Sequence, residues 1–166
     1  MTARRLFLLV YGVSGAAALI YEVAWTRLLT LQMGHGIAAA STVLAAFMGG
    51  LAIGSAAGGH VGGRLTPAGA LRTYAKLEVA IAALALLLPF GLALVEPLLA
   101  ATYANGDPSV TFALLRLLSA LLLVAVPAAA MGATFPIASR WMVPDASRAA
   151  GSAGHLYAAN TVGASL

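Results

Sequence analysis

The sequence predicts an all-α protein built from transmembrane helices, and its composition and hydropathy pattern support this. Hydrophobic residues make up 61% of the 166 residues, only 8% are charged, and the mean hydropathy is +0.95. A soluble domain carries about 25% charged residues. Apolar runs of about 20 residues, the length that crosses a bilayer, recur along the chain. We therefore expect a polytopic transmembrane helical bundle, as a single domain over residues 1–166.

The first expected helix covers residues 6–31, roughly 39 Å at 1.5 Å per residue, which is enough to cross a bilayer with some tilt. It follows a basic start, Arg4 and Arg5, that resembles the beginning of a signal peptide. The apolar stretch is too long for the 7–15-residue core of a cleaved signal. We interpret it as a retained transmembrane helix.

The second expected helix covers residues 37–62, after a tight turn at residues 34–36. Glycines recur in it at every fourth position: Gly50, Gly54, Gly58 and Gly62. This spacing places them on one helix face, where a neighbouring helix backbone can approach closely. We expect this face to serve helix packing rather than ligand binding.

The third and fourth expected helices cover residues 71–101 and 110–142, and both contain prolines. We expect Pro89 and Pro97 to kink the third helix or to end its regular part early. Pro127 and Pro136 are expected to interrupt the fourth, with a broken or widened turn at residues 131–136. Polar connections at residues 102–109 and 143–148 separate these segments.

A fifth apolar segment covers residues 151–166 and corresponds to only about 24 Å of helix, short of the roughly 30 Å hydrocarbon core of a bilayer. We therefore expect an incomplete fifth transmembrane helix and a chain that is a fragment of a longer one. Its own C-terminal part, further copies or other subunits would then supply neighbouring helices.

The basic residues predict the orientation. If four helices alternate in direction, Arg27 and Arg116 lie on one side, and the others lie opposite: Arg4, Arg5, Arg64, Arg72, Lys76, Arg140 and Arg148. Loops rich in Lys and Arg stay in the cytoplasm. We expect a multi-pass protein of the bacterial inner membrane with a cytoplasmic N-terminus. Basic residues at helix ends are typical of membrane topology, and we expect no nucleic-acid partner.

Two charged residues, Glu22 and Arg27, interrupt the first apolar segment. Charges at the centre of a membrane helix cost roughly 2.5–3.5 kcal/mol each on insertion scales, so they usually face protein, water or each other. Five residues correspond to about 140° around a helix, which excludes a good pair within the helix. We therefore expect partners on other helices: Arg116 for Glu22, and Glu96 for Arg27.

Three interpretations of Glu22 and Arg27 remain open. They are structural anchors between helices, or they mark a site for a cationic small molecule, or Arg27 extends to the membrane surface with Trp25 in the aromatic belt. In the second case Glu22 is the counter-ion, and Tyr21 and Trp25 offer aromatic faces to the cation.

Other polar residues give weaker signals. Asn160 is expected to form hydrogen bonds with a neighbouring helix. Glu78 lies close to Arg72 and Lys76 in sequence, and we expect an interfacial, solvated charge. The chain has no cysteine, and its histidines lack metal-ligand spacing. No nucleotide-binding or nucleophile motif occurs. We identify no catalytic residue, metal site or cofactor in this chain.

Four stretches together resemble the membrane domain of the bacterial fused transporter-like/spermidine synthase family: residues 14–29 (SGAAALIYEVAWTRLL), 41–55 (STVLAAFMGGLAIGS), 131–136 (MGATFP) and 156–163 (LYAANTVG). The resemblance implies a membrane module that, in longer relatives, precedes a soluble aminopropyltransferase-like domain acting on putrescine. No residue of that domain occurs in this chain. Residues 58–64 (GGHVGGR) echo the loop of major-facilitator transporters but lack its acidic residue.

These observations leave three functional hypotheses. The chain is the membrane module of a spermidine synthase-like protein, which anchors or serves polyamine chemistry located outside it. Alternatively, it is a carrier of polyamines or other cations that uses Glu22, or a non-catalytic subunit of a larger membrane complex that docks through the glycine face at Gly54 and Gly58.

Overall fold

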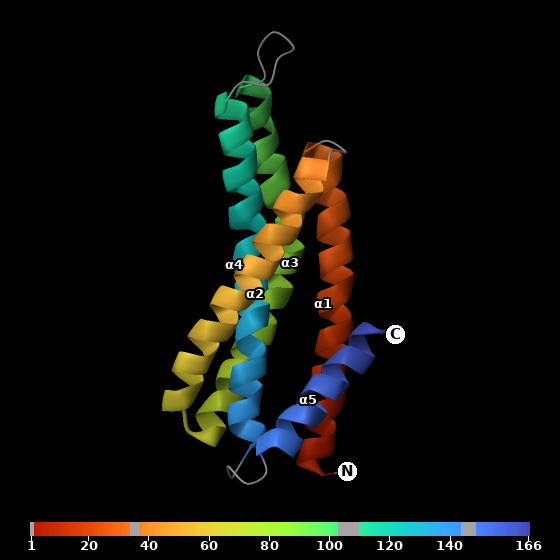
Figure 1. Cartoon of the computed structure of the whole chain (residues 1–166), viewed down its shortest axis with the longest axis vertical. Helices are drawn as coiled ribbons and strands as arrows, with labels where there is room; N and C mark the ends of the chain where they lie inside the picture. Colours follow the sequence, from red (N-terminus) through yellow and green to blue (C-terminus); the bar gives the residue numbers. More distant parts are fainter. Residues whose placement is uncertain (1, 34–36, 103–109, 144–148) are drawn as a thin grey trace.

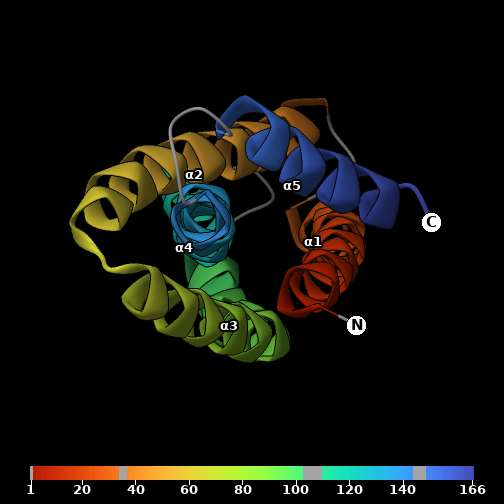
Figure 2. The same ribbon diagram turned by 90° about the horizontal axis from the view of Figure 1, so that it is seen from below.

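The structure, a computed structural model, describes residues 2–33, 37–102, 110–143 and 149–166, and these form five α-helices and no strand. The helices are α1 (Ala3–Met33), α2 (Ile37–Arg64), α3 (Pro67–Thr102), α4 (Val110–Met142) and α5 (Ala149–Ala164). Successive helices run in opposite directions (Figure 1), and α4 lies at the centre with the other helices around it (Figure 2). The expected all-α bundle is confirmed.

Four helices, α1 to α4, are long and apolar enough to cross a membrane. Large apolar side chains cover their outer surface, and several are at least 70% exposed: Val13, Val79, Leu86, Phe90 and Leu94. Apolar surface on this scale is unfavourable in water and favourable against lipid chains. The exposed surface therefore fits a bilayer environment.

The helix ends divide the basic residues as the sequence predicts. The start of α1, the end of α2, the start of α3 and the end of α4 lie together at the lower end of the bundle (Figure 1). These segments carry all the described basic residues except Arg27 and Arg116. Arg148 lies outside the described residues. One contact reinforces this end, because Arg140 Nε donates to the carbonyl of Leu65 at 2.9 Å.

The prolines do not break the helices. Pro89 and Pro97 lie inside a continuous α3, and Pro127 and Pro136 lie inside a continuous α4. The expected early end of the third helix and broken turn at residues 131–136 were therefore wrong. Proline removes one backbone donor, but in membrane helices neighbouring helices and nearby side chains compensate for the lost bond.

The third helix begins before the expected position because Thr66 caps it. The backbone N–H of Gly69 donates to Thr66 Oγ1 at 3.2 Å. Pro67 occupies the first helical position, where a missing N–H costs nothing. A threonine cap followed by proline is a strong helix start, so residues 67–70 belong to α3.

The glycine face of α2 packs directly on α4. A Cβ on Gly50 would lie 2.6 Å from the carbonyl oxygen of Ala125, and one on Gly54 would overlap the backbone of Ala129. A Cβ on Gly58 would lie 2.7 Å from Cα of Ala133. Because α4 covers this face within the chain, the face is not available for docking a further subunit, and the expected docking surface at Gly54 and Gly58 was wrong.

The last glycine of the series, Gly62, has looser surroundings. A Cβ on it would lie 3.5 Å from the carbonyl oxygen of Pro136, an ordinary contact distance. From the other helix, Gly132 of α4 faces the backbone of Leu51. Small residues on both helices thus bring the two backbones closest in the middle of the crossing.

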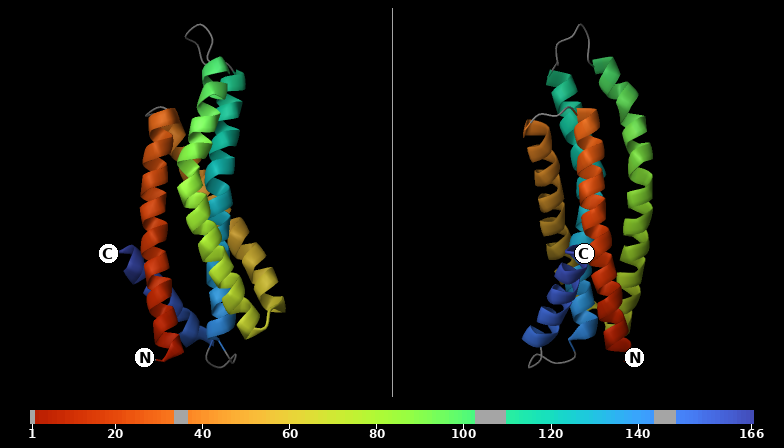
Figure 3. Two further views of the ribbon diagram at one scale, coloured as in Figure 1. Left: turned by 180° about the vertical axis from the view of Figure 1, so that it is seen from behind. Right: turned by 90° about the vertical axis from the view of Figure 1, so that its right-hand side faces the viewer.

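The helix α5 crosses α1 by the same principle (Figure 1). A Cβ on Gly163 would overlap the backbone carbonyl of Gly12, and a Cβ on Gly12 would lie 3.1 Å from the carbonyl oxygen of Ala159. This crossing holds α5 diagonally against the lower half of α1. Figure 3 shows the crossing from two further sides.

Replacing Gly163 with alanine is expected to destabilise the protein, whereas the same change at Gly154 is not. The methyl group at position 163 has no space, and overpacking of this kind costs about 1–3 kcal/mol. No atom lies within 4 Å of a Cβ on Gly154, so alanine there gains only helix propensity. Thermal unfolding of the two variants in detergent checks this. Equal midpoints would contradict the close α1–α5 contact.

Two apolar clusters close the bundle above and below its middle. The upper cluster includes Trp25, Leu29, Phe47, Leu88 and Val124. The lower cluster is aromatic and includes Phe7, Tyr11, Tyr74, Ile137 and Leu156, with Trp141 packed against it. The ring centroids of Phe7 and Trp141 are 4.5 Å apart, and those of Phe7 and Tyr74 are 5.0 Å apart.

Candidate functional site

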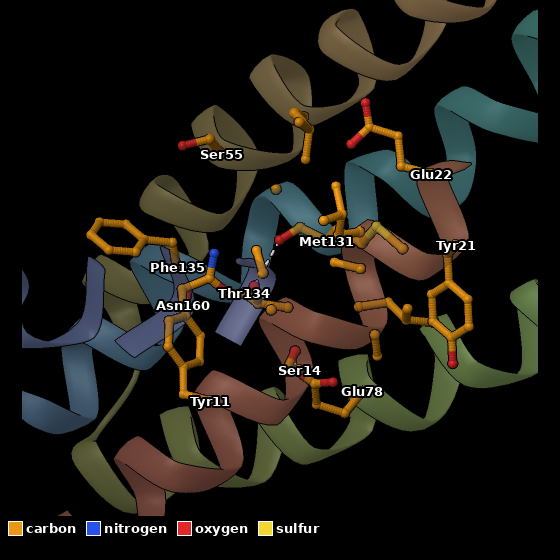
Figure 4. A pocket seen from close by; sticks show the side chains of 18 of the residues that line it. Tyr11, Ser14, Tyr21, Glu22, Ser55, Glu78, Met131, Thr134, Phe135 and Asn160 are labelled. Atoms are coloured by element: carbon orange, nitrogen blue, oxygen red, sulfur yellow. Dashed lines mark hydrogen bonds between the residues drawn. The ribbon is translucent and has the colours of Figure 1, made fainter. Parts of the chain in front are cut away.

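A cavity of about 580 Å³ lies where these two clusters meet, and residues of all five helices line it. Figure 4 shows this cavity from close by. Its lining mixes apolar side chains with a set of polar ones: Tyr11, Ser14, Tyr21, Glu22, Ser55, Glu78, Thr134, Tyr157 and Asn160. A polar cavity inside an apolar helical bundle is a candidate site by default, because intramembrane polar groups are costly.

The first carboxylate of the cavity is Glu22 of α1. It is half-buried and lines the cavity beside Tyr21. The apolar side chains of Phe47, Leu51 and Met131 line the same cavity. The structure therefore brings Glu22 and Tyr21 together at one site, as the cation-site interpretation expects.

The second carboxylate is Glu78 of α3. The hydroxyl of Ser14 on α1 donates to Glu78 Oε1 at 2.8 Å, which joins the two helices. Glu78 is half-buried and lines the cavity, a position that the expectation of a solvated or interfacial charge did not include. Figure 4 shows Glu22 and Glu78 on different sides of the cavity.

Sequence reasoning missed Glu78 because it weighed the neighbouring basic residues and not the helix face. Glu78 belongs to a stripe of α3 residues that follow one another at three- or four-residue steps, and the other members from 74 to 92 are buried: Tyr74, Ile81, Ala85, Leu88 and Leu92. This periodicity places Glu78 on the inward face. The signal is visible in the sequence as an apolar stripe with one acidic member.

A buried tyrosine completes the polar layer at Glu78. Tyr74 is one helical turn before Glu78 and is only 3% exposed. Its hydroxyl lies next to Ser14 and Glu78 but forms no hydrogen bond of ordinary geometry. A buried polar group without a partner costs about 1–3 kcal/mol, and such groups are rare in native proteins.

The described charged residues that line the cavity are all acidic. Its described lining residues include Glu22 and Glu78, and they include no lysine, arginine or histidine. Carboxylates attract cations, and the attraction is stronger for partly buried groups than at a fully exposed surface. The arrangement therefore favours a positively charged ligand over a neutral or anionic one.

Asn160 reaches the cavity from α5. It lines the cavity, and its Oδ1 atom would lie 2.7 Å from a Cβ on Gly15 of α1. The residue thus sits at the α1–α5 contact, where the absence of a side chain on Gly15 makes room for it. Its amide provides both a donor and an acceptor at the cavity wall.

Trp25 and Arg27 do not share this site. Trp25 is 3% exposed and belongs to the upper apolar cluster, where its ring stacks on that of Tyr21 with centroids 5.7 Å apart. It does not line the cavity, so it offers no face to a ligand there. Arg27 is exposed and lines a shallower hollow on the outer side of α1, which Glu22 also borders.

The expected interhelical ion pairs do not form. No pair within 4.0 Å joins Glu22 to Arg116 or Arg27 to Glu96, and all four residues belong to the described part of the chain. Glu96 is exposed on α3, and the guanidinium of Arg116 lies 5.5 Å from the ring centroid of Phe112 on its own helix. The expected pairing was wrong because Glu22 turns toward the central cavity instead.

Comparisons with protein-family models, with curated proteins and with solved structures find no match to this chain. The assignment of a function therefore depends on the geometry and chemistry of the cavity.

Proposed function

We propose that this chain is a membrane module that binds an elongated organic cation with two amino groups in its central cavity. The observation that carries the proposal is the pair Glu22 and Glu78, which line one cavity whose described lining residues include no lysine, arginine or histidine. Each carboxylate is the natural counter-ion for one ammonium group.

The spacing of the two carboxylates supports a long ligand. The hydrogen bond from Ser14 fixes Glu78 at the level of Ser14 on α1. Glu22 follows Ser14 by eight residues on the same helix, a separation of about 12 Å along the axis at 1.5 Å per residue. A compact monovalent ion cannot bridge this separation, whereas a linear aliphatic diamine or polyamine can.

The wall between the carboxylates suits the carbon chain of such a ligand. Apolar residues from several helices line the cavity, among them Ala18 of α1, Ile81 of α3 and Met131 of α4. Methylene groups gain about 0.8 kcal/mol each when they are buried. A ligand with charged ends and an aliphatic middle matches this pattern, and the hydroxyl of Tyr21 adds a hydrogen-bonding group beside Glu22.

The sequence resemblance to the membrane domain of spermidine synthase-like proteins supports polyamines as the ligand class. In this proposal the chain either carries a polyamine across the membrane or holds it for an aminopropyltransferase outside this chain. The clustering of basic residues at the lower end of the bundle supports an inner-membrane protein with its N-terminus in the cytoplasm.

Uptake of radiolabelled putrescine and spermidine into liposomes containing the purified chain tests the carrier form of the proposal. We expect saturable uptake by the unmodified chain and a loss of at least tenfold in Glu22→Gln. Uptake that is unchanged in the variant would refute the role of Glu22. Saturable binding without uptake would favour the holding role, and neither binding nor uptake would refute the proposal.

A further inference from the structure

A second hollow, a surface groove of about 710 Å³, lies between α1 and α5 and shares no lining residue with the central cavity. We call it the α1–α5 groove. Its lining residues come from α1, among them Arg5, Leu9 and Val13, and from α5, among them Ala158 and Gly163.

Small residues create this groove. The close crossing at Gly12, Ala159 and Gly163 leaves no side chain to fill the angle between the two helices. Larger apolar side chains border it and remain exposed, with Leu9 at 60% and Val13 at 70%. The groove is thus mainly apolar, and it lies along α1, a helix that is apolar enough to cross a membrane.

One end of the groove is charged. Among the described residues that line it, Arg5 has the only charged side chain, and it lies near the start of α1, at the basic end of the bundle (Figure 1). The groove then follows α1 from Arg5 to Ala16, a length of about 16 Å along the helix axis. Its chemistry therefore changes from cationic to apolar in the direction from the membrane surface toward the membrane interior.

We infer that the α1–α5 groove binds an anionic phospholipid, with its phosphate at Arg5 and one acyl chain along the apolar furrow. A hollow facing the hydrocarbon core does not fill with water, so an acyl chain or another apolar group occupies it. Arginine binds phosphate through two parallel N–H donors. Basic residues at the cytoplasmic ends of membrane helices favour anionic headgroups. The amphiphile that matches one cationic end and one apolar furrow is a lipid.

Native mass spectrometry of the purified full chain, mixed with phosphatidylglycerol or phosphatidylcholine of identical acyl chains, tests this inference. We expect phosphatidylglycerol to be retained more strongly. Arg5→Gln should weaken its retention roughly fivefold, the size expected for one basic residue facing an anionic lipid. Arg5→Lys should restore part of the difference, because lysine keeps the charge but loses the paired donors.

Two control variants separate the headgroup from the acyl chain. Arg4→Gln removes a neighbouring exposed charge that does not line the groove, and it should leave the lipid preference unchanged. Ala158→Phe fills the groove from an exposed position and should lower retention of both lipids. Equal effects of Arg4→Gln and Arg5→Gln would overturn the inference, since the preference would then follow net charge alone.

If a second copy of the chain, rather than a lipid, occupies the α1–α5 groove, a cross-linking experiment gives a different result. The chain has no cysteine, so Ala158→Cys introduces a unique thiol in the groove. We expect little disulfide-linked dimer in bilayers rich in phosphatidylglycerol. Efficient cross-linking of two copies, independent of lipid composition, would overturn the lipid site and identify the groove as a contact between helices.

Discussion

Replacing either Glu22 or Glu78 with glutamine is expected to weaken binding of a linear diamine by roughly thirtyfold. Each substitution keeps the shape of the side chain and removes the partner of one ammonium group. Leaving one member of a desolvated charge pair without its partner costs about 2 kcal/mol or more, and each 1.4 kcal/mol corresponds to a tenfold change in affinity. Equilibrium binding of the diamine to the purified variants measures the effect.

A third carboxylate provides the matched control. Glu96 lies on α3, like Glu78, but it is exposed and does not line the cavity, so Glu96→Gln should bind the diamine as the unmodified chain does. An alkyl monoamine of the same length should be sensitive to only one of the two cavity substitutions. Equal losses in all three variants would indicate a general effect of net charge and would contradict a two-ended site.

Leucine in place of Gly54 is expected to disrupt the fold, with a loss of more than about 3 kcal/mol of stability, beyond the usual range for overpacking. Even a single methyl group at this position would overlap the backbone of Ala129, and backbone cannot move aside as a flexible side chain can. The variant should yield less monodisperse protein and a lower thermal unfolding midpoint in detergent.

The control for Gly54→Leu lies on the same helix. No atom is within 4 Å of a Cβ on Gly59, which is exposed, so Gly59→Leu adds only apolar surface toward lipid. It should unfold at about the same temperature as the unmodified chain. Comparable unfolding of the two variants would contradict the α2–α4 interface.

Much of the fold was predictable from the sequence because the membrane simplifies the problem. Backbone groups in lipid must form helices, so each long apolar run becomes one helix. The glycines of α2 could be assigned to helix packing, although their partner helix could not. The expected effect of the prolines was wrong, because prolines that would end a helix in a soluble protein lie within α3 and α4.

The site was only partly predictable. Glu22 stood out because it interrupts an apolar segment, and Tyr21 came with it. Glu78 was assigned to the membrane surface, because its nearest charges in sequence are basic. The partners expected for Glu22 and Arg27 were wrong because pairing depends on how each helix is rotated about its axis. That rotation is fixed by packing at places such as Gly54 and Gly163, and no single segment of sequence contains it.

The central claim is that one cavity holds two ammonium groups at once, and a chain-length series tests it most directly. Affinities of the purified chain for α,ω-diamines of increasing length should be measured by calorimetry, each beside the monoamine of equal length. We predict that diamines bind more tightly than their monoamines and that affinity rises with length until the two amino groups reach Glu22 and Glu78 together, because each ammonium group must lie about 2.8 Å from its carboxylate. Equal affinities for diamine and monoamine at every length would contradict the account.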